Sequence, residues 1–215
     1  MTIVIKLFHM AERQVEDSRD MVPIDLGQFG GVVSVGAFEH FCSVGEFQAG
    51  KQDGIYQDFF AFCWARLPVG GRLFIQTMVW DRMPDPDRVS LDAPKGSDEY
   101  LLALLRKFYP GSWLPNGQEQ IIRNAKGFKL IDSISGKDDY IETMKQWGAR
   151  TRRRTPSLLW ERAKLVPRYL TNRHFRLQVK SLNNAANRQM FERGIIGHFR
   201  MTFEKVELET DGENS

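Results

Sequence analysis

The sequence predicts an α/β fold built on a mainly parallel sheet that is covered by helices. Short segments rich in β-branched and aromatic residues alternate along the chain with segments of helical periodicity. The clearest strand runs from Val32 to Val35 and lacks period-two alternation, which favours a strand buried on both faces. Gly36 then ends it. Strands that alternate with helices are typical of a parallel sheet.

In the amino-terminal half, the same patterns predict the other elements. Apolar residues spaced for one helix face predict a helix over Ile55–Leu67, and Pro68–Gly71 forms a turn into the next strand. The elements expected here, in order, are a strand at Thr2–Leu7, a short helix at Met10–Val15, a loop at Met21–Phe29, a flexible connection at Cys42–Gly54, the helix at Ile55–Leu67, a strand at Arg72–Trp80 and an exposed, proline-rich loop at Asp81–Pro94.

In the carboxyl-terminal half, helices predominate. Leucines that share one face predict a helix over Asp98–Phe108. Prolines are expected to break the long helical segment that follows the strand at Phe128–Ser135. The elements expected here are the helix at Asp98–Phe108, a helix at Gln118–Ala125, a strand at Phe128–Ser135, a mostly helical segment from Tyr140 to about Arg193 with breaks at Pro156 and Pro167, and a final strand at His198–Glu207.

Composition indicates an ordinary soluble domain. The chain has 215 residues, of which 42% are hydrophobic and 27% charged. Its longest apolar runs fall short of the ~20 residues that a membrane span requires, and we identify no secretory signal, so a cytoplasmic protein is expected. Cys42 and Cys63 have no metal-ligand spacing and are expected to be free and structural.

Positive charge is concentrated late in the chain. The segment from Lys145 to Arg200 has 14 Lys and Arg against two acids, a net +12, which suits an anionic lipid surface or nucleic acid. The run Arg150–Arg154 is most simply a solvated face. It lacks the interleaved aromatic residues of a base-stacking surface, so lipid is favoured over nucleic acid.

Glu39 and His40 are the first candidates for chemistry. They follow the Val32–Val35 strand, and ligands of open α/β sheets lie at the carboxyl ends of strands. Taken alone, Glu39 could simply be an acid at a helix start, where the helix dipole favours it. Tyr140 alone would be a packing residue, and Gln76 alone a polar residue at a strand end.

Four blocks of sequence, in order, resemble one known family. They are SVGAFEHF from Ser34, YQDFFAFCWARLPVGGRLFIQT from Tyr56, KFYPGSWLP from Lys107 and GFKLIDSISGKDDYIETMKQW from Gly127. The family is that of the cyclopropane-fatty-acyl-phospholipid and mycolic acid cyclopropane synthases, and the likeness spans about Glu16 to Lys205. It implies a Rossmann-like class I methyltransferase fold.

The resemblance also implies a domain organisation. Residues 1–215 would form a single, partial methyltransferase domain that begins at about the family's third strand and lacks its first strands. Helical insertions would cover an acyl cavity, and a basic helical segment would extend over residues 140–195.

By the same resemblance, the chain transfers a methyl group from S-adenosylmethionine to a cis double bond of a lipid acyl chain. The carbocation that forms requires fixed dipoles, a positioned base and a dry site. In the family, a bound bicarbonate ion is thought to be that base. The implied partners are an unsaturated phospholipid or another acyl lipid and, through peripheral contact, an anionic membrane surface; nucleic acid is not expected.

Three residues are implied to be catalytic. The family's Glu aligns with Glu39 and its Tyr with Tyr140, and both would hold the bicarbonate ion. The family's His aligns with Gln76, where this sequence departs from the pattern. A Gln amide can donate a hydrogen bond to an anion, but it cannot become charged or relay a proton.

Four residues are implied to contact the cofactor or the ion beside it. They are Val35 and Gly36 at the strand end, where the backbone of Val35 would also touch the ion, and the pair Asp17 and Ser18. Asp17 keeps the acid of the family's adenine-contacting pair, whereas Ser18 replaces its aromatic residue.

No glycine-rich turn occurs in Met1–Phe29, so the alternative is a catalytically inactive, truncated remnant that has lost cofactor binding. A basic nucleic-acid binder is the third hypothesis.

Overall fold

We describe a computed structural model of the chain, in which residues 2–4, 28–108, 111–151, 155–184 and 186–207 are described. The elements are β1 (Thr2–Val4), β2 (Gly31–Val35), the 3-10 helix η1 (Phe38–His40), α1 (Val44–Gln48), α2 (Gln52–Arg66), β3 (Arg72–Trp80), α3 (Asp98–Phe108), α4 (Gly117–Asn124), β4 (Phe128–Ser135), α5 (Lys137–Thr151), α6 (Pro156–Thr171), α7 (Arg173–Asn184), α8 (Ala186–Glu192) and β5 (Ile196–Lys205).

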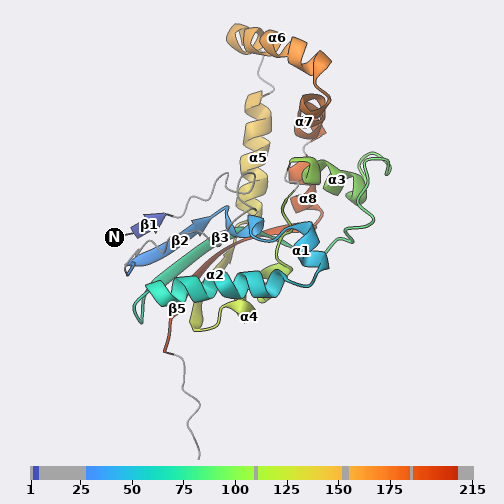
Figure 1. Cartoon of the computed structure of the whole chain (residues 1–215). Helices are drawn as coiled ribbons and strands as arrows, with labels where there is room; N and C mark the ends of the chain where they lie inside the picture. Colours follow the sequence, from blue (N-terminus) through green and yellow to red (C-terminus); the bar gives the residue numbers. More distant parts are fainter. Residues whose placement is uncertain (1, 5–27, 109–110, 152–154, 185, 208–215) are drawn as a thin grey trace, which may run out of the picture. The chain divides into compact units, whose positions relative to one another are not determined.

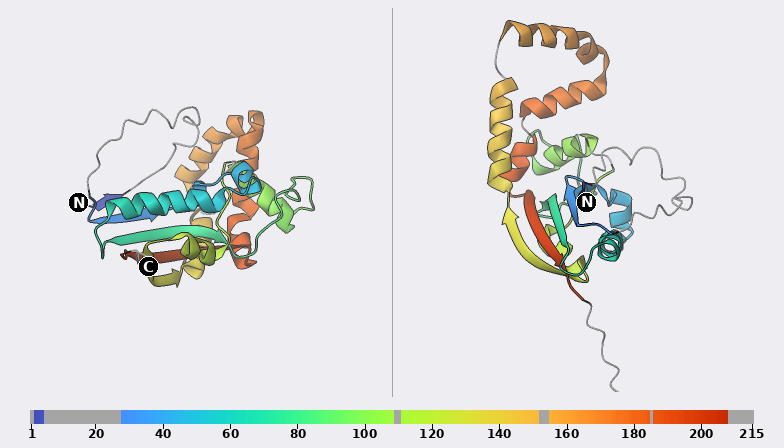
Figure 2. Two further views of the ribbon diagram at one scale, coloured as in Figure 1. Left: turned by 60° about the horizontal axis from the view of Figure 1, so that its bottom comes forward. Right: turned by 90° about the vertical axis from the view of Figure 1, so that its left-hand side faces the viewer.

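The described strands form one five-stranded sheet in the order β1-β2-β3-β5-β4 (Figure 1). β1 pairs with β2 and β2 with β3, both in parallel, whereas β4 and β5 pair antiparallel. Helix α2 connects β2 to β3 and lies along the sheet in Figure 1 and in the left view of Figure 2. A parallel pair needs such a crossover because its strands run in the same direction. The α/β fold that the sequence predicts is confirmed.

The sheet contains the predicted parallel pairs and one antiparallel pair, β4–β5. One detail of the prediction is wrong. β2 is not covered on both faces: Val32 and Ser34 are buried, whereas Val35 is 44% exposed. The valines of this strand therefore do not indicate burial on both faces, because Val is favoured in strands on either face.

The segment Cys42–Gly54 is not the flexible connection that its glycines predict. It contains α1 and the first residues of α2. Ser43 and Glu46 form a capping box: the Ser43 backbone N–H donates to Glu46 Oε2 over 2.8 Å, and the Glu46 backbone N–H donates to Ser43 Oγ. Reciprocal bonds of this kind satisfy the free N–H groups at a helix start, so a helix forms despite Gly45.

Pro167 does not break the helical segment either. It lies inside α6, which runs without interruption from Pro156 to Thr171, so that prediction is wrong. A proline removes one N–H bond within a helix, in this case the bond to the carbonyl of Ala163, and Ala163 is exposed to water that can replace the donor. Pro156, in contrast, begins α6 after the N-cap Thr155 and marks the predicted break.

The chain divides into two compact units. The first comprises residues 1–80, 111–135 and 198–215, and the second comprises residues 81–110 and 136–197. The second unit is helical for most of its length: α8 packs against α3 and α5, and α7 packs against α6. The organisation of residues 1–215 as one methyltransferase domain stays a prediction.

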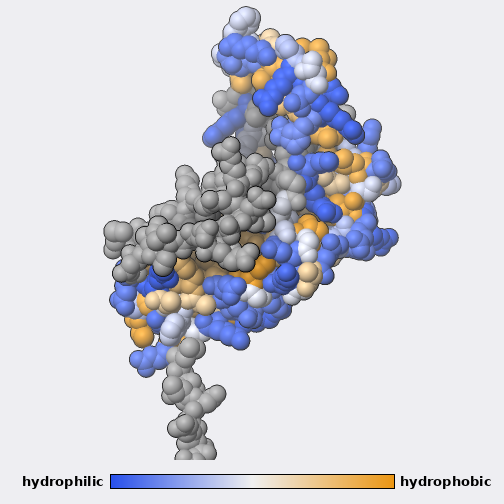
Figure 3. All heavy atoms as spheres, viewed as in Figure 1, coloured by the Kyte–Doolittle hydropathy of each residue, from blue (hydrophilic) through white to orange (hydrophobic). Residues whose placement is uncertain are grey.

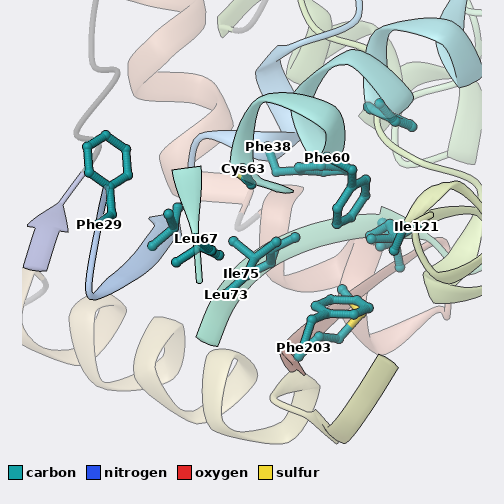
Figure 4. Packing of buried hydrophobic residues seen from close by; sticks show 14 of the residues in the cluster. Phe29, Phe38, Phe60, Cys63, Leu67, Leu73, Ile75, Ile121 and Phe203 are labelled. Carbon is teal, nitrogen blue, oxygen red and sulfur yellow. The ribbon is translucent and has the colours of Figure 1, made fainter. Parts of the chain in front are cut away.

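The core of the first unit lies between α2 and the sheet. Figure 4 shows Phe38, Phe60 and Cys63 gathered near Leu73 and Ile75 of β3. Phe38 is fully buried, and its ring centroid lies 4.6 Å from that of Tyr56 in a stacked arrangement. Cys42 and Cys63 are both buried and free, as predicted. This core fixes the loop that follows β2, because Phe38 belongs to η1.

Lys205, at the end of β5, holds the carboxyl-terminal end of α2. Its Nζ donates to the backbone carbonyls of Trp64 and Leu67, each over 2.7 Å, and lies 3.8 Å from the centroid of the Trp64 ring. The last carbonyls of a helix have no partner within the helix, so this buried ammonium group supplies their donors.

We expect Lys205→Met to lower the free energy of unfolding by about 2–3 kcal/mol, because two buried carbonyls lose a charged donor. Urea unfolding followed by circular dichroism measures the change. The matched control is Lys129→Met, on an exposed position of β4, which should change stability by less than about 0.5 kcal/mol. Equal losses in both variants would contradict the capping role.

Candidate functional site

The site begins at the turn that ends β2. Gly36 has φ +62°, a conformation that residues with a side chain rarely adopt, and its N–H donates to the Gln76 carbonyl over 3.0 Å. Val35 is the partner of Gln76 across the β2–β3 pair. The turn therefore brings the end of β2 beside the middle of β3, and η1 follows at once.

Glu39 lies in η1 and is only 3% exposed. Its Oε2 lies 2.9 Å from Thr77 Oγ1, and that hydroxyl lies 3.1 Å from the Met78 carbonyl oxygen. The other carboxyl oxygen, Oε1, lies 3.7 Å from the position that a Cβ on Gly36 would occupy. The carboxyl group is thus held between the Gly36 turn and β3.

Burial raises the pKa of the Glu39 carboxyl to about 6. Hydrogen bonds from the Glu39 backbone and from Thr77 act in the opposite direction, but desolvation is the larger effect. A carboxyl group with this pKa exists in both protonation states near neutral pH, so it can act as a proton donor or as an acceptor.

His40 adjoins Glu39 and is half-buried. Its Nδ1 lies 2.6 Å from the hydroxyl of Ser112, and burial lowers the pKa of the imidazole below its usual value. The segment that follows Ser112 is tied to the same region, because the Trp113 N–H donates to the Cys42 carbonyl over 2.7 Å. The loop from residue 111 to 115 is therefore fixed beside the carboxyl end of β2.

The structure brings four of the predicted site residues together at the β2 turn. They are Val35, Gly36, Glu39 and Gln76. Side chains alternate along a strand, so Gln76, which is half-buried, points to the opposite face of β3 from Thr77. Gln76 thus reaches this region through its backbone carbonyl, and its bond with the Gly36 N–H helps to set the turn.

The other predicted site residues are not placed against this turn. Tyr140 lies on α5 in the second unit, half-buried, with its ring centroid 5.4 Å from that of Phe191. That Tyr140 lies close to Glu39 stays a prediction. Asp17 and Ser18 lie outside the described residues, as does the helix predicted at Met10–Val15.

Two polar residues of this region were not identified from the sequence. Thr77 is buried and contacts Glu39, and the strand alternation Leu73, Ile75, Thr77 could have indicated a polar residue on the core face. Ser34 is also buried, and its hydroxyl has no hydrogen-bond partner among the described residues. A buried hydroxyl without a partner carries a desolvation cost.

The described part of the chain holds no group of three His, Cys, Asp or Glu residues that could bind a metal ion. None of its helices has the length and apolar character needed to cross a bilayer.

Comparison with known proteins identifies the family. The family model for mycolic acid cyclopropane synthetase matches residues 6–183. Among curated proteins, the chain is 28% identical over 119 residues to cyclopropane mycolic acid synthase 2 of Mycobacterium leprae, covering 55% of this chain and 38% of the relative. It is 26% identical over 122 residues to hydroxymycolate synthase MmaA4 of Mycobacterium tuberculosis, covering 54% of this chain and 36% of the relative. The match thus spans well under half of these relatives.

Solved structures agree with the family match. The cyclopropane synthase MmaA2 from Mycobacterium tuberculosis superposes with a TM-score of 0.57 at 22% identity, over 83% of this chain and 56% of that chain. The mycolic acid cyclopropane synthase CmaA1, complexed with SAH and CTAB, gives 0.56 at the same identity and coverage. The fold is that of the class I S-adenosylmethionine-dependent methyltransferases, as the sequence predicts. The chain therefore belongs to the mycolic acid cyclopropane synthetase family.

Proposed function

We propose that this chain transfers a methyl group from S-adenosylmethionine to a cis double bond of a lipid acyl chain. The observation that carries the proposal is the buried carboxyl of Glu39, with a pKa of about 6, beside the turn that ends β2. In a parallel α/β sheet this end of the strands is where ligands bind. Membership of the family supplies the reaction class.

The turn at Gly36 fits a cofactor that approaches the backbone closely. A Cβ added at Gly36 would meet only the Glu39 carboxyl within 4 Å, so space lies open beside the turn. Val35, next to it, is the exposed residue of β2. Val35 and Gly36 would hold the cofactor through their backbone groups, with Asp17 and Ser18 as the proposed contacts to its adenosine part.

S-adenosylmethionine supplies an electrophilic methyl group when bound. It would give that methyl group to one alkene carbon as its sulfur–carbon bond breaks, so that positive charge would develop on the neighbouring substrate carbon. Loss of one proton would then neutralise this charge. The chain's own contribution is a dry, apolar setting with a fixed negative or hydrogen-bonding group near the cation.

A bicarbonate ion is proposed as the base that takes up this proton, and Glu39 as one of the residues that hold the ion. The raised pKa of Glu39 suits this role, because a protonated carboxyl can donate a hydrogen bond to an anion whereas a carboxylate would repel it. Gln76, implied to be a donor to the same ion, contributes here through its backbone carbonyl, which accepts from the Gly36 N–H, and Tyr140 is proposed as the residue that completes the site. We propose an acyl lipid, such as an unsaturated phospholipid, as substrate, and a cytoplasmic protein that works at the periphery of an anionic membrane.

Titration calorimetry with S-adenosylmethionine tests the proposal. We expect saturable heat at cofactor concentrations up to the millimolar range. We also expect Asp17→Asn to weaken binding by about tenfold, because a charged hydrogen-bond acceptor is lost. Asp20→Asn, three residues further on, is the matched control and should bind as the parent does.

Absence of heat at millimolar cofactor would contradict the proposal and favour the inactive remnant that has lost cofactor binding. If Asp17→Asn and Asp20→Asn bind equally well, the assignment of Asp17 is wrong while the methyltransferase proposal stands. The same titration repeated with S-adenosylhomocysteine reports whether the charged methyl group is itself recognised.

A further inference from the structure

Helix α6 of the second unit exposes apolar side chains along its length. No residue of α6 is buried, and Leu159 is 49% exposed, Trp160 66%, Val166 50% and Leu170 66%. Apolar and charged residues lie side by side over this helix at the top of the view in Figure 3. A helix with no buried face gains little from packing, so its stability in isolation is low. Such a helix indicates a surface with a partner.

Most of the exposed apolar residues lie on one face of α6, whereas Leu165, 45% exposed, lies on another. Leu159, Ala163, Val166 and Leu170 are separated by four, three and four residues, which places them in one stripe along the helix. Trp160 lies at the edge of this stripe. We call Leu159, Trp160, Val166 and Leu170 the α6 apolar face.

Positive charge surrounds the α6 apolar face. Residues 155–179 contain five Lys and Arg, of which Arg162 and Lys164 are nearest the stripe, and a single acid, Glu161. Lys164 pairs with Glu161 over 2.7 Å and its Nζ lies 5.7 Å from the centroid of the Trp160 ring. The Cζ atom of Arg168 lies 4.8 Å from the centroid of the Phe175 ring of α7. Both basic side chains thus lie on aromatic rings at the surface.

We propose that the α6 apolar face docks on an anionic lipid bilayer. An apolar stripe with basic residues and a Trp beside it matches helices that lie in the plane of the membrane interface, where the apolar face enters the headgroup region. Anionic headgroups attract Lys and Arg over roughly a Debye length. A second copy of the chain fits less well, because a symmetric contact would bring the two sets of basic residues together.

This inference rests on the proposed function only in its choice of lipid as the partner. The test reads binding to vesicles without any methyl transfer, so its failure leaves the cofactor titration unaffected. The converse also holds, because a chain that binds no S-adenosylmethionine can still dock on a bilayer.

The experiment is co-sedimentation of the full chain with vesicles of phosphatidylcholine alone and with vesicles that contain about 30% phosphatidylglycerol. We expect binding to the anionic vesicles that weakens when salt is raised from about 0.1 M to about 0.5 M. The triple variant Leu159→Gln, Val166→Gln, Leu170→Gln should bind about tenfold more weakly or worse. The matched control changes exposed apolar residues of the first unit, Val69→Gln, Ile131→Thr and Ile134→Thr, and should bind as the parent does.

If circular dichroism shows that the triple variant is poorly folded, a second variant tests the proposal instead. Arg162→Gln with Lys164→Gln leaves the apolar stripe intact and should remove most of the preference for anionic vesicles. Unchanged vesicle binding by both variants would overturn the proposal. Two other results would do so as well: a dimer in sedimentation velocity that the triple variant converts to monomer, or duplex DNA that binds more tightly than vesicles and loses affinity in the triple variant.

Discussion

Glu39→Gln is expected to stabilise the folded chain at pH 7.5 by about 2 kcal/mol while removing the proposed methyl transfer. The Glu39 carboxyl has a folded-state pKa of about 6, above its ordinary value of 4.5, so the folded chain binds this proton more tightly than the unfolded chain. The stability that the proton confers is complete below pH 4.5 and is lost as the pH rises through 6. Glutamine has a similar shape and stays neutral, so the variant avoids that loss.

Urea unfolding at pH 4.5 and at pH 7.5 measures this difference. The parent and Glu39→Gln should be of nearly equal stability at the lower pH, and the variant should be the more stable one at the higher pH. Glu142→Gln, on the exposed side of α5, is the control and should change stability by less than about 0.5 kcal/mol. A stability difference that is the same at both pH values would contradict an ionised, buried carboxyl in the folded chain.

The activity of the same variant separates a chemical role from a structural one. Loss of a general acid or base lowers the rate by about 100-fold or more, although the protein is better folded at the assay pH. Methyl transfer to an unsaturated phospholipid, followed with radiolabelled S-adenosylmethionine, is the readout. Retention of the full rate by Glu39→Gln would show that Glu39 is not catalytic.

Phe38→Ala is expected to lower the free energy of unfolding by about 3–5 kcal/mol. The Phe38 side chain is fully buried, and its ring lies among those of Phe41, Tyr56, Phe59 and Phe60, with centroids 4.6–6.1 Å away. Alanine would leave a cavity beneath η1. Water that enters this cavity would also bring the pKa of Glu39 back toward its ordinary value, because desolvation is what raises it.

Urea unfolding gives the stability change, and the pH dependence of unfolding gives the pKa change. Phe62→Ala on α2 is the matched control: Phe62 is 37% exposed, and its loss should cost about 1 kcal/mol or less. A comparable loss of stability in both variants would mean that the aromatic cluster around Phe38 does not anchor η1.

The elements that were predicted well depend on short-range patterns. Arg72–Trp80, Asp98–Phe108 and Phe128–Ser135 have the predicted bounds, because a turn or a helix-breaking residue marks their ends in the sequence. α1 was not predicted, because Gly45 was interpreted as part of a flexible connection. The hydrogen bonds between Ser43 and Glu46 form a capping box that stabilises the helix despite this glycine. The antiparallel β4–β5 pair could not be predicted, because strand direction depends on where the intervening helices pack.

In the candidate site, too, features that depend on short-range sequence were predicted and long-range contacts were not. The Glu39 position followed from a strand end and from the resemblance of its surrounding block to a family. The partner of Glu39 did not follow, because Thr77 is far away in sequence and comes close only through the β2–β3 pairing. Tyr140 belongs to the other unit, so its assignment still depends on resemblance alone.

The position of Thr77 between two acceptors affects the rate at which the Glu39 carboxyl gains or loses its proton. Its hydroxyl has one hydrogen and lies within reach of both Glu39 Oε2 and the Met78 carbonyl oxygen. When Glu39 is ionised, the hydroxyl donates to the carboxylate; when Glu39 is protonated, the hydroxyl turns to Met78 and accepts from the acid. Gain or loss of the proton thus requires rotation about a single C–O bond and no displacement of the strands, so reorganisation of the surroundings adds little to the barrier.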